Sequence, residues 1–121
     1  MANTFKVVTF AAEPASAGTA YKMYTVAGST TTVVLGVVLT NIHSSAVTAE
    51  VELVSDTGSR GGNNDVTNTT AFLVKDVNIP AGSSLEVLTG GKVVMERTDY
   101  LNIDCSVADK LSGTLSIMEI T

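Results

Sequence analysis

A run of apolar and β-branched residues, Thr31–Ile42, is the most distinctive pattern in the chain. Turn residues flank it on both sides, so it predicts a β-strand. Successive strand side chains point to opposite faces, so one face should carry four apolar residues: Val33, Leu35, Val37 and Leu39. Val34 and Val38 should lie on the other face, which would then also be largely apolar. Either another part of this chain or a second copy of it is expected to cover that second face.

Eight further segments have the alternating or β-branched composition of short strands. They are Thr4–Phe10, Ala20–Val26, Val47–Val54, Ala71–Val77, Leu85–Leu88, Lys92–Glu96, Tyr100–Val107 and Thr114–Ile120. The fifth and sixth of these are expected to form a hairpin across Thr89-Gly90-Gly91. Short strands, frequent turns and no convincing helix predict an all-β fold, an antiparallel, jelly-roll-like β-sandwich of about eight to nine strands.

With 121 residues, the chain is expected to form a single domain over 1–121. The segment 55–70 has one apolar residue and three glycines, which predicts a long loop that a partner would order. Four of its residues are candidate partner contacts: Arg60, Asn63, Asn64 and Asp65. The last three could also offer oxygen atoms to a hard cation, although a solvated loop is the simpler interpretation. The N-terminal segment 1–10 is a second candidate contact element.

The charge pattern argues against two classes of partner. The net charge is −5 and the seven Lys and Arg residues are scattered, so no nucleic-acid partner is expected. No apolar run approaches the ~20 residues that a membrane-spanning helix requires, so no membrane partner is expected. The N-terminus lacks a basic region followed by an apolar stretch, which predicts synthesis in a host cytoplasm without a cleaved leader.

Residues able to carry chemistry are few. His43 lies in a predicted turn, and Cys105 lies on the apolar face of its strand, so they do not compose a usual zinc site. Glu50 and Glu52 are spaced about 7 Å apart along one strand face, as in some glycosidases, but no Trp is present to stack on a sugar. A polar outer face explains this pair better. We therefore expect no enzymatic activity, no cofactor and no metal.

The pattern of apolar residues on both strand faces recurs at Val7-Val8 and Val93-Val94-Met95. Together with the run at 31–42, it predicts a homo-oligomer whose subunit interface includes four valines: Val34, Val38, Val8 and Val94. Burying one valine contributes roughly 1.5 kcal/mol or more, so several on one face are enough to matter for association. A loop of the same chain covering this face is the alternative.

Several strand and turn segments together resemble small virion structural proteins of tailed bacteriophages, particularly the marine cyanophage type. These segments are Tyr24–Val26, Thr30–Gly36, Leu39–Asn41, Phe72–Lys75, Ile79–Leu85, Gly91–Glu96 and Leu115–Ile120. The resemblance extends from about Phe5 to the last residue. It implies a non-enzymatic β-sandwich present in many copies in the particle, and it carries over no functional residue.

The resemblance and the acidic charge together favour a capsid decoration (cement) protein that binds the major capsid protein on the outer surface of the virion. A neck, collar, tail or fibre-associated protein that contacts other virion proteins is the first alternative. A carbohydrate-binding module for host attachment is a third interpretation, based on strand content alone. Its weakness is that the aromatic residues suited to a sugar platform are limited to three tyrosines: Tyr21, Tyr24 and Tyr100.

Overall fold

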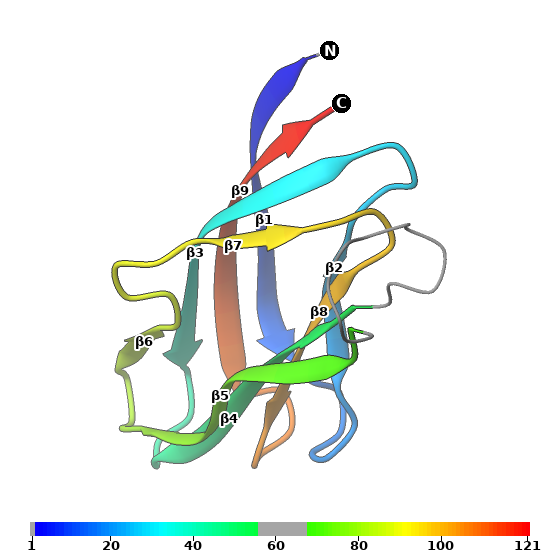
Figure 1. The fold of residues 1–121 in the computed structure, drawn as a ribbon. Coiled ribbons are helices and arrows are strands. Elements are labelled where there is room, and N and C mark those ends of the chain that lie inside the picture. The colour runs from blue at the N-terminus through cyan, green and yellow to red at the C-terminus, as the bar shows by residue number, and fades with distance from the viewer. Residues whose placement is uncertain (1, 56–67) are drawn as a thin grey trace.

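The computed structural model describes residues 2–55 and 68–121, and all of its regular elements there are β-strands (Figure 1). This confirms the predicted all-β class. The strands are β1 (Asn3–Glu13), β2 (Tyr21–Thr25), β3 (Thr31–Asn41), β4 (Val47–Val54), β5 (Thr70–Ile79), β6 (Ser84–Glu86), β7 (Val93–Met95), β8 (Tyr100–Cys105) and β9 (Leu111–Ile120).

The strands form two antiparallel sheets. Sheet I has the order β1-β9-β3-β6, with β7 also paired to β3, and sheet II has the order β2-β8-β4-β5. The inward side chains of both sheets make one apolar core, as expected for a sandwich. Its fully buried members include Val37, Leu39, Leu115 and Ile117 from sheet I and Val51, Leu101 and Ile103 from sheet II.

A β-bulge interrupts the side-chain alternation of β3. Val34 lies opposite Ile117 of β9, but Gly36 lies opposite the next residue of β9, so Leu35 has no partner in that register. An inserted residue reverses the alternation. Thr32 and Val34 therefore point into the core before the bulge, and Val37 points into it afterwards. The expectation of one unbroken apolar face from Val33 to Leu39 is wrong for this reason.

The expected hairpin between the segments now seen as β6 and β7 is also wrong. Both strands pair with β3 and follow one another along it, β6 beside Val38–Thr40 and β7 beside Thr32–Val34. The segment between them leaves the sheet opposite the bulge, and the Val87 N–H still donates to the Val37 carbonyl at 2.8 Å. Figure 1 shows β3 changing direction between these two halves.

The N-terminal segment is part of the sheet. β1 pairs with β9 without a break from Asn3–Ile120 to Phe10–Gly113. The Phe10 ring lies directly over Gly113, where an added Cβ would come within 2.3 Å of two ring carbons. The segment 1–10, expected as a contact element, is therefore also structural, because deleting 2–10 would remove most of β1 and the core residue Phe10.

A buried amide at the end of β3 holds two turns together. The Asn41 side chain donates to the carbonyls of Ser45 and Ile79, both at 2.9 Å, and accepts the His43 N–H at 2.7 Å. Asn41 is completely buried, and these bonds satisfy its amide as burial requires. They fix the turn after β3 against the end of β5.

Candidate assembly interface

A row of apolar side chains crosses the outer face of sheet I. Phe5 of β1 lies opposite Met118 of β9, Met118 lies opposite Val33 of β3, and Val33 lies opposite Val94 of β7. Directly opposed residues share a face with their Cβ atoms about 4.5–5.5 Å apart, so the four side chains form a continuous row. The two ends are the most open, with Phe5 72% and Val94 61% exposed.

Two more valines widen this row. Val7 is 65% exposed beside Phe5, and Val38 is 37% exposed on the other half of β3. We call the whole set the apolar face: Phe5, Val7, Val33, Val38, Val94 and Met118. The strands of the described residues make two sheets, so no third layer of them covers it. Glu86, opposite Val38, is the charged residue that the strand registers place on this side of sheet I.

The predicted interface residues divide into two groups. Val38 and Val94 lie on the apolar face and are exposed. Val34 is 0% exposed in the core, because it precedes the bulge, and Val8 packs against the same core from β1. Val34 therefore cannot contact a second copy as predicted, whereas Val8 is only partly buried and lies on the core side of sheet I instead of on the apolar face. The four predicted loop contacts lie outside the described residues: Arg60, Asn63, Asn64 and Asp65.

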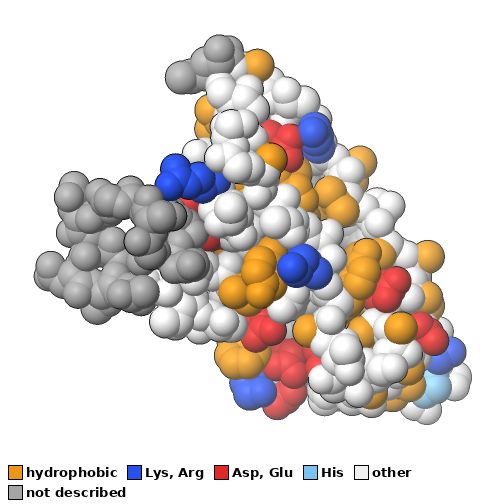
Figure 2. All heavy atoms as spheres, turned by 90° about the vertical axis from the view of Figure 1, so that its right-hand side faces the viewer, with side chains coloured by type: hydrophobic (Ala, Val, Ile, Leu, Met, Phe, Trp, Pro, Cys, Tyr) orange, Lys and Arg blue, Asp and Glu red, His pale blue; other side chains and the backbone are white. Residues whose placement is uncertain are grey.

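The outer face of sheet II has a different composition. The row that crosses it consists of Lys22, Asn102, Glu52 and Phe72. The Asn102 amide donates to Glu52 at 3.2 Å, and the Lys22 ammonium lies 4.0 Å from the centre of the Tyr100 ring. Figure 2, from the right-hand side of Figure 1, shows acidic and basic side chains side by side on the surface it displays.

The carboxylate pair singled out in the sequence belongs to this polar surface. Glu50 forms an ion pair with Lys75 at 3.4 Å, and Glu52 accepts a hydrogen bond from Asn102. Both side chains are partly exposed and project from neighbouring positions of β4. Ordinary surface pairing therefore accounts for both, in agreement with the expectation of an outward polar face.

A polar network that the sequence did not reveal joins the two sheets. The Tyr24 hydroxyl of sheet II donates to Glu119 of β9 at 2.6 Å and lies 2.8 Å from the Thr32 hydroxyl of β3. The Lys6 ammonium completes the network, 2.7 Å from the other Glu119 oxygen. Burial and the bond to Glu119 raise the pKa of Tyr24 to about 12. The bonds from Lys6 and Tyr24 lower the pKa of Glu119. These groups stabilise one another and hold the sheets in register.

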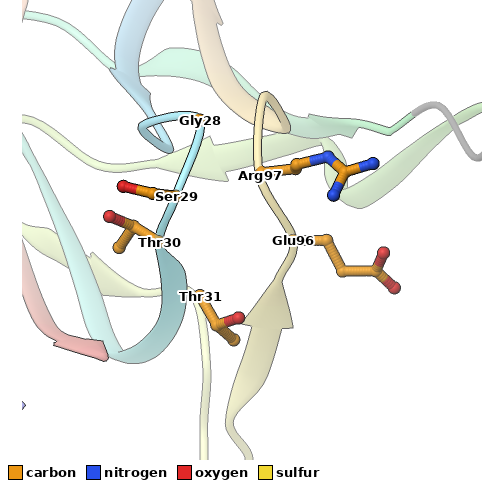
Figure 3. Close-up of a pocket in the computed structure, with 6 residues that line it drawn as sticks. All are labelled: Gly28, Ser29, Thr30, Thr31, Glu96 and Arg97. Atoms are coloured by element: carbon orange, nitrogen blue, oxygen red, sulfur yellow. The ribbon is translucent and has the colours of Figure 1, made fainter. Parts of the chain in front are cut away.

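The hollow between the turns that follow β2 and β7 has polar walls: Gly28, Ser29, Thr30, Thr31, Glu96 and Arg97. Figure 3 shows the side chains of Ser29 and Thr30 pointing to one side and those of Glu96 and Arg97 to the other. Binding sites for small molecules use polar groups that converge on one point, and this hollow does not have that arrangement.

The remaining candidates for chemistry are separated. His43 lies in the turn after β3, and Cys105 is a free, buried cysteine near the end of β8. Within residues 2–55 and 68–121, no group of three or more His, Cys, Asp or Glu side chains is arranged to hold a metal ion. That part of the chain also contains no helix long and apolar enough to cross a membrane.

The three tyrosines available for a sugar platform are occupied within the fold. Tyr21 packs edge-on against Phe10 with ring centres 5.2 Å apart, Tyr24 belongs to the network between the sheets, and Tyr100 lies beneath Lys22. A sugar platform needs open aromatic faces, so the structure gives the carbohydrate-binding interpretation no support.

Comparison with known proteins gives likeness in fold. No protein-family model and no curated protein matches the chain. The chain is similar to VP2 in the crystal structure of an infectious bursal disease virus subviral particle, with 12% identity and a TM-score of 0.50. This match covers 96% of the chain and 32% of VP2, so the chain spans about a third of VP2. A second similar structure is that of Bacillus endospore appendages, described as disulfide-linked pili, with 15% identity, a TM-score of 0.44 and coverage of 99% and 87%.

Proposed function

We propose that this chain is a non-enzymatic structural protein of a virus particle and acts as a decoration protein on the capsid of a tailed phage. The observation that carries the proposal is the apolar face of sheet I, with its row from Phe5 to Val94. A sheet face of this kind is suited to contact with another protein surface, because its side chains gain stability when water is removed from them.

The size of the apolar face is sufficient for such a contact. Burying one Val or Phe side chain contributes roughly 1.5–3 kcal/mol, and Phe5, Val7 and Val94 are each more than half exposed. Together these residues offer on the order of 5–10 kcal/mol before the entropy cost of association is subtracted. That amount fits a small subunit bound to an ordered lattice of larger ones.

Charge and fold are compatible with this location. The net charge of −5 favours the outside of a capsid over a surface that faces packaged DNA, because like charges repel. The β-sandwich is shared with VP2, a protein that forms a subviral particle. The resemblance to tailed-phage virion proteins supplies the specific expectation of a decoration protein, with the major capsid protein as its partner.

Cryo-electron microscopy of the phage that encodes the chain tests the proposal. We expect the sandwich on the outside of the capsid in hundreds of copies, with the apolar face against its neighbours. Roughly six to a few dozen copies on the neck or tail would support the alternative assignment instead. Absence of the chain from purified particles would contradict both.

A variant pair tests the contact surface itself. Val94→Lys places a charge on the apolar face, so its binding to capsids that lack the protein should weaken by roughly tenfold or more. Phe72→Lys is the matched control, because Phe72 is 47% exposed on sheet II. Equal losses for the two variants would show that sheet I is not the contact surface.

A further inference from the structure

The four sheet edges of the sandwich differ in how they are protected from pairing with another strand. Natural sheets block their edges with short strands, bulges and charges. β2 is short and bulged, β6 and β7 are three residues each, and β5 has register shifts and a positive φ of 50° at Asp76. The first half of β1 has none of these devices except Lys6.

The hydrogen bonds at the N-terminus show which groups of β1 are unused. Ala2 and Thr121 exchange both of their backbone hydrogen bonds, at 3.1 and 3.0 Å. In an antiparallel ladder such pairs alternate, so the even residues of β1 bond to β9 and the odd residues direct N–H and C=O away from it. The outward-directed set is Asn3, Phe5, Val7 and Thr9. In the described part of the chain, β1 pairs with no strand other than β9.

The same odd residues also carry the apolar face. Phe5 and Val7 therefore combine an unused backbone donor and acceptor with an exposed apolar side chain. A strand that pairs with this edge would bond to the unused backbone groups and also cover the exposed side chains. Its directly opposed side chains would lie on the same side of the sheet as Phe5 and Val7.

We propose that the partner at this edge is the β1 strand of a second copy, paired antiparallel about a two-fold axis. Two observations favour a second copy. The copies carry a net charge of −5 each, but Lys6 is the one charged residue of 2–10 and it is ion-paired with Glu119 at 2.7 Å, so this edge presents little net charge to repel a copy. The edge is also self-complementary, because a two-fold axis through Phe5 or Val7 places that apolar side chain against its own copy.

The lysine on this edge restricts the register. Pairing Phe5 with Val7 of the second copy would place the two Lys6 residues directly opposite one another, which is unfavourable for like charges. Two neighbouring registers avoid this, one centred on Phe5 and one centred on Val7. Each would join the two copies of sheet I into one continuous sheet.

This inference deepens the proposed function and rests on it for its biological setting. Edge pairing brings two apolar faces into one surface of twice the area, available to the capsid. The test below uses the isolated protein. The protein can prove monomeric and still bind the particle through its apolar face. It can also prove dimeric and not bind the particle.

Sedimentation equilibrium of the isolated protein is the first test. We expect a dimer of twice the 12.5 kDa chain mass at micromolar concentrations. A monomeric protein overturns the inference. This holds even if the β1 edge is later found to bind an extended segment of another virion protein.

Backbone substitution then tests the edge. Val7→Pro removes an N–H that points away from β9, so β1 keeps its bonds within the sheet while the dimer loses a bond from each copy. Its dissociation constant should rise by roughly tenfold or more. Val7→Thr is the matched control, because it keeps the N–H and the β-branched shape. Circular dichroism confirms that both variants are folded, and an unchanged dissociation constant for Val7→Pro overturns the inference.

Cysteine cross-linking reads the register without depending on affinity. Opposed residues in such a pair have Cα atoms about 5.5 Å apart, within disulfide range. We expect either Phe5→Cys or Val7→Cys to form a disulfide-linked dimer on oxidation, according to the central residue. Ser116→Cys on β9 is the control, since its distance across the pair is about three strand spacings, or roughly 14 Å. The native Cys105 is buried. Failure of both β1 variants to cross-link contradicts the two-fold pairing.

Discussion

The two outer faces of this sandwich carry matched rows of four residues, all apolar on sheet I and mostly polar on sheet II. Phe5, Met118, Val33 and Val94 cross sheet I, and Lys22, Asn102, Glu52 and Phe72 cross sheet II. Both rows lie over the same apolar core, so the needs of the fold do not explain the difference. A face packed on one side alone is stable with polar residues outside, as sheet II shows. The apolar residues of sheet I therefore indicate a role outside the domain.

The largest expected effect comes from placing one charge on each side of β3, which tests whether one side is core and the other is surface. Val34→Asp puts a carboxylate in the core and should lower the free energy of unfolding by on the order of 4 kcal/mol. Val38→Asp changes the apolar face and should alter it by less than about 1 kcal/mol. Urea denaturation measures both. A large loss of stability for Val38→Asp would mean that this side of β3 is also core.

The same pair of variants separates two kinds of dimer. Val38 lies on β3, two strands from the β1 edge. If copies pair through β1, Val38→Asp leaves the dimer intact in sedimentation. If copies stack face to face, as the sequence pattern alone first suggested, it shifts the dimer to monomer.

A second comparison concerns two glycines of sheet I. Gly113→Ala places a methyl group against the Phe10 ring and should cost about 2 kcal/mol of unfolding free energy. Gly36→Ala is the control, because nothing lies within 4 Å of the added carbon and its φ is not positive. Thermal unfolding should show a clear fall in Tm for the first variant and little change for the second. Equal effects would mean that the contact with Phe10 is unimportant.

The network between the sheets gives a pH-dependent effect. Tyr24→Phe should lower the free energy of unfolding by about 1 kcal/mol near neutral pH. The folded-state pKa of Tyr24 is raised from 10.0 to about 12, so its contribution is complete below pH 10 and is lost as the pH rises toward 12. The pKa of Glu119 is lowered, so its contribution is present above its ordinary value of 4.5 and is lost at lower pH.

Urea denaturation of the wild type and Tyr24→Phe at a series of pH values checks the pH dependence assigned to Tyr24. The stability difference between the two proteins should be constant near neutral pH and should shrink above pH 10. Tyr21→Phe is a useful control, since that ring packs against Phe10 outside the network. A difference that grows at alkaline pH would contradict the assigned bond.

The smallest stability effect is expected on the outer faces themselves. In the monomer, Phe5→Lys and Phe72→Lys should each change the free energy of unfolding by about 0.5 kcal/mol or less, because both side chains are exposed. Their effects on the binding of a hydrophobic dye should differ. Phe5→Lys should reduce dye binding because it interrupts the apolar row, and Phe72→Lys should not. Similar dye binding by both would contradict the contrast between the faces.

Much of this fold is local in origin and was predictable. Nine strand segments follow from alternation and turn residues, and Val38 and Val94 were identified among the residues that prove exposed. The bulge at Leu35 was missed; Gly36 within the strand pattern is a local signal for a bulge, but the partner strand decides where the extra residue lies. That single residue reversed the expected side of Val34.

Other errors have the same long-range cause. Gly90-Gly91 has the composition of a hairpin turn, but the strands on either side, β6 and β7, pair with β3 and not with each other. The last strand was expected to begin at Thr114, but β9 also includes Gly113, which the Phe10 ring covers from β1. Asn41 was expected only as a member of the strand run 31–42, and its buried amide bonds depend on carbonyls that only the folded chain brings near.

The pairing of β1 with β9 also determines when the protein can fold during its synthesis. Translation at roughly 5–20 residues per second takes about 6–24 s for 121 residues. For most of that interval β1 has been made without its neighbour, whereas the four strands of sheet II are all complete before β9 is made. The newborn chain therefore carries an unpaired strand containing Phe5 and Val7 for most of its synthesis. Yield in a cell will depend on elongation rate and on chaperones that shield this strand until β9 emerges.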